Sequence, residues 1–202
     1  MTVLGADDDV VAALGHVPRR VAVAGVSGSG KTTLAGRVGA VLGLPHTEID
    51  GLFHGPGWTR RPEFLDDVAA LLAQDAWAVE YQYRQVRPRI AERAEVVVWL
   101  DLPTRVTMWQ VVVRTVRRRV RRVELWNGNL EPPLWTLVRR SDENIVWWSW
   151  STRRSLDGLD AHLAAEHPHL VVVRLRSHRA ADRWLRRLGA SAGSAADRPG
   201  QG

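Results

Sequence analysis

Gly25-Val26-Ser27-Gly28-Ser29-Gly30-Lys31-Thr32 has the pattern G-x-x-x-x-G-K-[ST] of a phosphate-binding loop, and it decides the fold. An apolar run, residues 21–24, comes directly before it, and the helix formers Leu34 and Ala35 follow. This succession of strand, loop and helix is the context that the motif requires. Lys31 is also the only lysine of the chain, so a compact ammonium stands where it can reach the β- and γ-phosphates of a nucleoside triphosphate.

The loop supplies the donors that a triphosphate needs. Its backbone N–H groups are expected to converge on the β-phosphate, assisted by the N-terminal dipole of the following helix. The hydroxyl of Thr32 is expected to bind Mg²⁺, and that of Thr33 to reach the α-phosphate. We therefore predict that ATP and Mg²⁺ bind here. The residues predicted to bind the nucleotide are Gly25, Ser27, Gly28, Ser29, Gly30, Lys31, Thr32 and Thr33.

Composition narrows the class of protein. The chain has 202 residues, of which 45% are hydrophobic, enough for the core of one domain. It has no cysteine, which excludes disulfides and thiolate metal sites. Residues 1–9 contain no positively charged side chain, unlike a secretory signal, and the apolar stretches are too short to span a bilayer. These features predict a soluble, cytoplasmic protein without a membrane partner.

Apolar runs and helical patterns alternate along the chain, which predicts an α/β fold whose parallel sheet is covered on both faces. We expect one domain over residues 1–189 and a disordered tail over residues 190–202, which are rich in small residues. The predicted strands are residues 21–25, 45–50, 76–81, 95–100 and 169–175. The predicted helices include residues 33–42, 63–74, about 104–125 and 180–188.

Three carboxylates follow predicted strands, at the edge where active sites of such sheets form. Asp50 is predicted to orient or deprotonate an acceptor hydroxyl, although an Asp that starts a turn is the alternative. Glu80 is predicted to lie beside the metal ion, and its alternative is a salt bridge to Arg84. Asp101 is as compatible with capping the next helix as with a role in the site.

A block of six arginines and no acid lies within residues 114–122. On a continuous helix five of them fall within an arc of roughly 140°. Guanidinium groups suit phosphate oxygens, so we predict that Arg114, Arg118 and Arg122 stabilise the charge that develops in phosphoryl transfer. A solvated face and a nucleic-acid contact are the weaker alternatives.

Ten tryptophans are unusual for this length. Trp147, Trp148 and Trp150 lie on a helical stretch, and we predict core or helix packing for most of the tryptophans. Trp58 is the exception, because it lies in a Gly- and Pro-rich loop after Asp50 and is a candidate for the wall of an acceptor pocket. The seven histidines lack metal-ligand spacing, so we predict no metal other than Mg²⁺ bound with the nucleotide.

The order of these motifs resembles the P-loop proteins called DNA topology modulation or FlaR-like proteins, relatives of adenylate and shikimate kinases. The resemblance covers about residues 20–186 and is carried, beyond the phosphate loop, by four segments. They are Glu48-Ile49-Asp50-Gly51-Leu52-Phe53, Trp77-Ala78-Val79-Glu80, Trp99-Leu100-Asp101-Leu102-Pro103 and Glu124-Leu125-Trp126-Asn127-Gly128-Asn129. It implies a three-layer P-loop fold with five parallel strands in the order 2-3-1-4-5. It also implies an arginine-rich lid over about residues 104–166, and phosphoryl transfer from ATP to a small-molecule or nucleotide acceptor.

One segment departs from that family. Relatives carry Asp-Gly-Asn-Tyr after the third strand, where this chain has Glu80-Tyr81-Gln82-Tyr83. Bulky side chains therefore replace an open turn beside the expected acceptor pocket, which implies either a different acceptor or weakened catalysis. A nucleotide-regulated nucleic-acid-binding protein and a slow ATPase stay as alternative functions, and the residues predict no oligomeric state.

Overall fold

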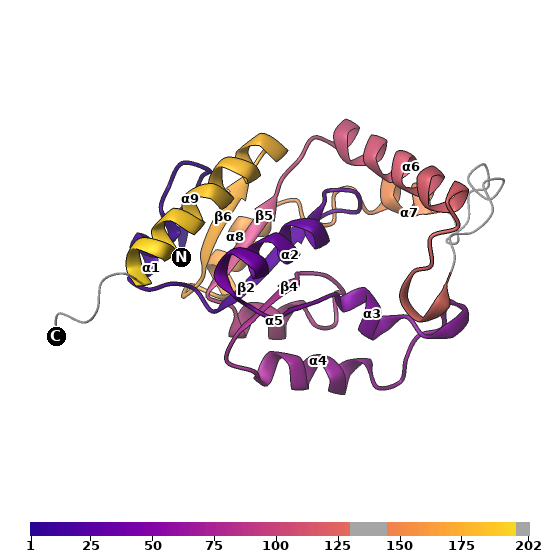
Figure 1. The fold of residues 1–202 in the computed structure, drawn as a ribbon, viewed down its shortest axis with the longest axis horizontal. Coiled ribbons are helices and arrows are strands. Elements are labelled where there is room, and N and C mark those ends of the chain that lie inside the picture. Colours follow the sequence, from indigo (N-terminus) through magenta and orange to yellow (C-terminus); the bar gives the residue numbers. More distant parts are fainter. Residues whose placement is uncertain (130–144, 197–202) are drawn as a thin grey trace.

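The computed structural model describes residues 1–129 and 145–196 (Figure 1). Its strands are β1 (Thr2–Leu4), β2 (Arg20–Gly25), β3 (His46–Thr47), β4 (Trp77–Glu80), β5 (Val96–Leu100) and β6 (Val171–Leu175). Its α-helices are α1 (Val10–Leu14), α2 (Lys31–Leu42), α3 (Ile49–Phe53), α4 (Phe64–Ala73), α5 (Arg87–Arg93), α6 (Thr104–Val120), α7 (Ile145–Ser151), α8 (Leu159–Glu166) and α9 (His178–Ala196). Two short 3-10 helices are η1 (Pro56–Trp58) and η2 (Trp126–Gly128).

All six strands form one parallel sheet in the order β1-β6-β5-β2-β4-β3. The expectation of a five-stranded sheet is wrong, because β1 adds an edge strand in which Thr2 lies opposite Val171. From the other edge the strands follow as β3, β4, β2, β5, β6 and β1. A three-residue edge strand pairs on one side only and is too short for a periodic pattern, so the sequence gives no signal for β1.

Helices cover both faces of the sheet, which gives the three-layer α/β arrangement seen in Figure 1. Alternate residues of β2 separate the two cores, as expected for a strand. Val21 and Val23 pack with α1, α2 and α9, whereas Ala22 and Ala24 pack with α4, α5 and α8. Because β2 is central and buried on both faces, the loop that follows it is held at a fixed place above the sheet.

Two elements end differently from what the sequence predicts. β3 stops at Thr47 and Asp50 lies in α3, because the N–H of Ile49 donates to Glu80 Oε2 (3.0 Å) and leaves the strand ladder. α9 continues to Ala196, so residues 190–196 are helix and not a disordered tail. Alanine is the strongest helix former, and Ser191 Oγ ties this end to Asp9 Oδ2 at 2.8 Å.

The extents of the domain and of the lid remain predictions. The described part of the lid region consists of α6, η2, α7 and α8, and residues 130–144 of the expected insertion lie outside the described residues. Residues 197–202 of the expected tail lie outside them as well. Within the described ranges, no helix combines the length and the apolar character needed to cross a membrane.

Candidate active site

A cleft of about 2370 Å³ opens at the carboxyl ends of β2 and β4 and beneath α6. Of the residues predicted to bind the nucleotide, all except Ser29 line it. The side chain of Ser29 is fully buried beneath the loop, where a Cβ at position 25 would clash with it. Gly25 therefore makes room for the tight turn of the loop, in which the N–H of Ser29 donates to the carbonyl of Val26 (3.1 Å).

The loop fits a phosphate group. Gly28 and Gly30 have φ values of +76° and +86°, which side chains rarely adopt, and a Cβ on Gly28 would also clash with the carbonyl oxygen of Thr107. α2 begins at Gly30 without a side-chain cap, so its first N–H groups are left for a ligand. An uncapped N-terminus of a 12-residue helix, joined to a glycine-lined cradle, is a site that favours an anion.

Lys31 lies near two carboxylates, those of Asp50 and Glu80. Burial lowers the pKa of its ammonium, and these two carboxylates oppose that shift. The cations of Arg114 and Arg87 lower the pKa further. Lys31 thus belongs to a charged cluster with four side chains from four other elements, α3, β4, α5 and α6.

Glu80 is the buried member of this cluster, with 1% of its surface exposed. Its Oε2 accepts from the N–H of Ile49, and the Thr32 hydroxyl also hydrogen-bonds to it. Its ionic partner is His46, with 3.7 Å between His46 Nε2 and Glu80 Oε1, so the expected alternative of a salt bridge to Arg84 is wrong. Strand pairing decides this, because β3 brings His46 beside β4 while Arg84 lies beyond the strand's end.

The hydroxyl of Thr32 and the carboxylate of Glu80 fit Mg²⁺, which prefers oxygen ligands. In the described part of the chain, no three His, Asp or Glu side chains are grouped to hold a metal ion. Mg²⁺ usually takes one or two protein ligands and its other ligands from substrate phosphates and water.

The His46–Glu80 pair makes a pH-dependent contribution to stability. The nearby carboxylate of Glu80 raises the pKa of His46 above 6.5, and the hydrogen bonds that Glu80 accepts lower the pKa of Glu80 below 4.5 although burial acts in the opposite direction. The stabilisation is therefore fully present between about pH 4.5 and 6.5. It is lost as the pH rises through the folded pKa of His46 or falls through that of Glu80.

We expect the stability difference between wild type and His46→Asn, measured by urea unfolding, to shrink from pH 6 to pH 9. A constant difference would contradict the pairing.

Asp50 is held by two side chains that the sequence marks only as a departure from the family pattern. Its Oδ1 accepts from Tyr83 Oη at 2.6 Å and from Gln82 Nε2 at 2.8 Å. Burial, and then the charge of Asp50, raise the pKa of Tyr83, so its hydroxyl stays protonated and remains a donor. Both bonds reach the same oxygen of Asp50, and no described residue donates to Oδ2. The bulky residues thus orient the carboxylate instead of merely narrowing the site.

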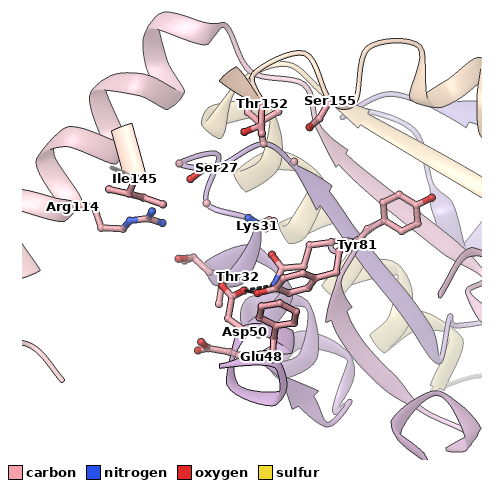
Figure 2. A pocket seen from close by; sticks show the side chains of 18 of the residues that line it. Ser27, Lys31, Thr32, Glu48, Asp50, Tyr81, Arg114, Ile145, Thr152 and Ser155 are labelled. Carbon is pink, nitrogen blue, oxygen red and sulfur yellow. Dashed lines mark hydrogen bonds between the residues drawn. The ribbon is translucent and has the colours of Figure 1, made fainter. Parts of the chain in front are cut away.

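α6 brings part of the arginine block to the cleft. Arg114, Arg117 and Arg118 line it, and Arg114 points from α6 toward the phosphate loop (Figure 2). Arg122, which the sequence places on the same face, is exposed and does not line the cleft. The helix ends at Val120 and Arg122 has a φ of +48°, so the helical arc does not extend to it.

Arg87 is a cleft residue that sequence reasoning missed. Its guanidinium lies 5.6 Å from the ring centroid of Tyr81, and it forms no hydrogen bond or ion pair with a described residue. Burial lowers its pKa, as expected for a cation that lacks a neutralising partner. Residues 84–93 contain four arginines, and nothing in their spacing singles out Arg87. Its position at the start of α5 is what directs it into the cleft.

Trp58 lines the cleft, and its place in the wall of an acceptor pocket stays a prediction. Of the predicted core or helix packing of Trp147, Trp148 and Trp150, the core part is wrong, because these side chains are 37–46% exposed. Their helix, α7, packs on α6, and within α7 only Ser149 is buried.

Asp101 lies outside the site. Its Oδ2 pairs with Arg174 at 2.8 Å, and the same arginine pairs with Asp160 at 3.0 Å. The N-cap of α6 is Pro103, so the capping alternative is wrong as well. Asp101 instead ties the ends of β5 and β6 to α8.

No protein-family model and no curated protein matches the chain. Among solved structures, a shikimate kinase from Acinetobacter baumannii in complex with shikimate is similar, with a TM-score of 0.50 and 12% identity, over 87% of this chain and 94% of that one. A gluconokinase from Sinorhizobium meliloti 1021 aligns with a TM-score of 0.48 and 18% identity, over 90% and 97% of the two chains. A sugar kinase from Janibacter sp. HTCC2649 aligns with a TM-score of 0.40 and 20% identity, over 89% and 94%. The resemblance to DNA topology modulation proteins has no counterpart in these comparisons. The likeness to the shikimate kinase shows that the chain has a P-loop kinase-like fold.

Proposed function

We propose that the chain is an ATP-dependent kinase that transfers the γ-phosphate to a hydroxyl group of a small acceptor. One observation supports this most strongly: an oriented carboxylate, Asp50, shares a cleft with a phosphate-binding loop and its lysine. Such a carboxylate can orient and deprotonate the hydroxyl group of an acceptor. The sequence-based link to the DNA topology modulation family is part of this proposal.

The cleft residues have separate roles in this reaction. The phosphate loop and Lys31 bind the triphosphate. Asp50 Oδ2 accepts the proton of the acceptor hydroxyl as the hydroxyl oxygen bonds to the γ-phosphorus, and the bond from that phosphorus to the β-phosphate oxygen breaks to release ADP. Arg114 and Arg118 offset the charge of the transferred group from the side of α6. Thr32 and Glu80 would hold Mg²⁺, which supplies further charge neutralisation on the phosphates.

The arginines of α6 bear on the alternative of a nucleic-acid-binding protein. Arg114, Arg117 and Arg118 line the cleft that the phosphate loop also lines. Arg114 and Arg118 are half-buried there, whereas Arg117, Arg121 and Arg122 are exposed. The two half-buried arginines of the cleft support the kinase over the nucleic-acid alternative.

We further propose that the acceptor carries an anionic group that pairs with Arg87. We expect Arg87→Ala to raise the KM for the acceptor by at least about 10-fold, while the KM for ATP changes by less than about 3-fold. Arg89→Ala is the matched control, because Arg89 is exposed on the same helix and does not line the cleft. Steady-state kinetics check this, and an equal rise of both KM values would place Arg87 on the nucleotide instead.

A phosphate-transfer screen tests the function as a whole. The protein is incubated with ATP, Mg²⁺ and a panel of nucleoside monophosphates, hydroxy acids and sugars, and the products are read by mass spectrometry with Lys31→Ala as the control. At least one phosphorylated product is expected from the wild type and none from the control. Slow hydrolysis that no acceptor accelerates would reject the kinase in favour of an ATPase.

A further inference from the structure

The segment Glu124–Asn129, which the proposed chemistry does not use, docks on the chain around Asp50. We call residues 124–129 the Asn129 turn and residues 48–59 the Asp50 segment. Asn129 is 5% exposed and uses both ends of its amide. Its Oδ1 accepts from the N–H of Trp58 (3.1 Å), and its Nδ2 donates to the carbonyl of Gly55 (2.9 Å). Only a carboxamide provides a donor and an acceptor at these two places.

Further contacts hold the same two segments together. Trp126 Nε1 donates to Glu48 Oε2 (2.8 Å), and its indole lies so close to Gly51 that a Cβ there would be 3.0 Å from Cδ1. The side-chain amide of Asn127 donates to the carbonyl of His54, whose ring stacks on that of Trp126. The Asn129 turn therefore binds both ends of the Asp50 segment, at Glu48 and at residues 54–58.

The turn is joined almost directly to α6. The N–H groups of Arg121 and Val123 donate to the carbonyls of Arg117 and Arg118, which closes the helix. Only Glu124 then separates this closure from the Leu125 N–H, which donates to the carbonyl of Asn129 within the turn. Figure 1 shows the chain leaving α6 and returning to the region of α3. The Asn129 turn therefore connects the Asp50 segment to the end of α6 that carries Arg118.

The Asn129 turn adds to the contacts that α6 makes with the core and with α7. The buried residues of α6 are Thr107, Val111 and Thr115, and the first two pack against Gly28 of the phosphate loop. With 17 residues the helix is about 25 Å long, so it reaches from the phosphate loop across the cleft. One end thus rests on the phosphate loop and the other on the Asp50 segment.

We propose that Trp126 and Asn129 are positioning residues that hold the α6 arginines over the phosphate loop, so that nucleotide binding is transmitted to the far end of the Asp50 segment. The triphosphate attracts the guanidinium groups of Arg114 and Arg118 and so restrains α6. Through the Asn129 turn this restraint reduces the motion of residues 55–59. By reciprocity, an acceptor that orders the Asp50 segment strengthens nucleotide binding. The inference rests on the proposed nucleotide site, but it does not depend on the identity of the acceptor.

Hydrogen exchange followed by mass spectrometry on the full chain tests the inference without turnover. With Mg²⁺ and a non-hydrolysable ATP analogue, we expect slower exchange in the phosphate loop and, by about 5-fold or more, in residues 55–59. In Asn129→Asp, which keeps the shape but loses the Nδ2 donor, residues 55–59 should no longer respond while the phosphate loop still does. Trp126→Phe should give the same loss, and Glu124→Gln, at an exposed position of the turn, should behave as wild type.

The outcomes separate this inference from the proposed function. Protection of the phosphate loop without any response of residues 55–59 in the wild type overturns the inference and leaves the nucleotide site intact. An unchanged response in both Asn129→Asp and Trp126→Phe overturns it as well. No protection of the phosphate loop rejects the nucleotide site, and the inference with it.

Discussion

Lys31→Ala is expected to lower kcat by about 10²–10³-fold, because it removes the ammonium proposed to bridge the β- and γ-phosphates. The loss is not confined to a missing hydrogen bond. Lys31 lies near Asp50 and Glu80, so its removal also leaves more of their negative charge unbalanced at the proposed triphosphate site. Steady-state turnover and calorimetry with a non-hydrolysable ATP analogue measure the effect on catalysis and on binding.

Lys31→Arg is the informative control for this substitution. It keeps the positive charge but replaces a compact ammonium with a planar guanidinium that does not fit between two phosphates in the tight loop. We expect it to rescue little of the activity. Full activity in Lys31→Ala, with the fold intact by circular dichroism, would contradict the assigned phosphate site.

Asp50→Asn is expected to lower kcat by about 10²–10⁴-fold, the usual range for the loss of a general base. Asparagine keeps the size of the side chain and an oxygen that can accept from Tyr83 and Gln82, so the site should keep its shape. The affinity for an ATP analogue should therefore stay within about 3-fold of wild type. Turnover with the acceptor found by the screen, combined with calorimetry, separates the two effects.

Tyr83→Phe provides a graded comparison at the same carboxylate. It removes the 2.6 Å hydrogen bond to Asp50 Oδ1 and leaves the stacking of the ring on Phe53. We expect a smaller loss of kcat, about 10-fold, because Gln82 still orients the carboxylate. If Asp50→Asn lost no more activity than Tyr83→Phe, Asp50 would not be the base.

The features that the sequence predicts well are those encoded locally. The spacing from Gly25 to Thr32 specifies the phosphate loop, since its glycines and lysine act through neighbouring backbone. The alternation of apolar runs with helical patterns predicts the covered parallel sheet, because each pattern reflects burial of one element. Predictions made from composition alone were wrong in two places. The tryptophans of α7 are exposed rather than in the core, and the end of α9 is helical rather than disordered.

Tertiary structure decided which side chains meet. The sequence contains Gln82, Tyr83 and Arg87, but only the path of the chain after β4 turns them toward Asp50 and the cleft. It also contains Asn129, but it does not indicate that the amide of this residue hydrogen-bonds to Trp58 and Gly55, more than seventy positions away. A motif records the chemistry of neighbours along the chain, whereas pairing across a cleft depends on the packing of whole elements. For this reason the sequence by itself determined the class of fold and the loop between β2 and α2, and the folded chain alone decided how Asp50, Arg87 and α6 are arranged around that loop.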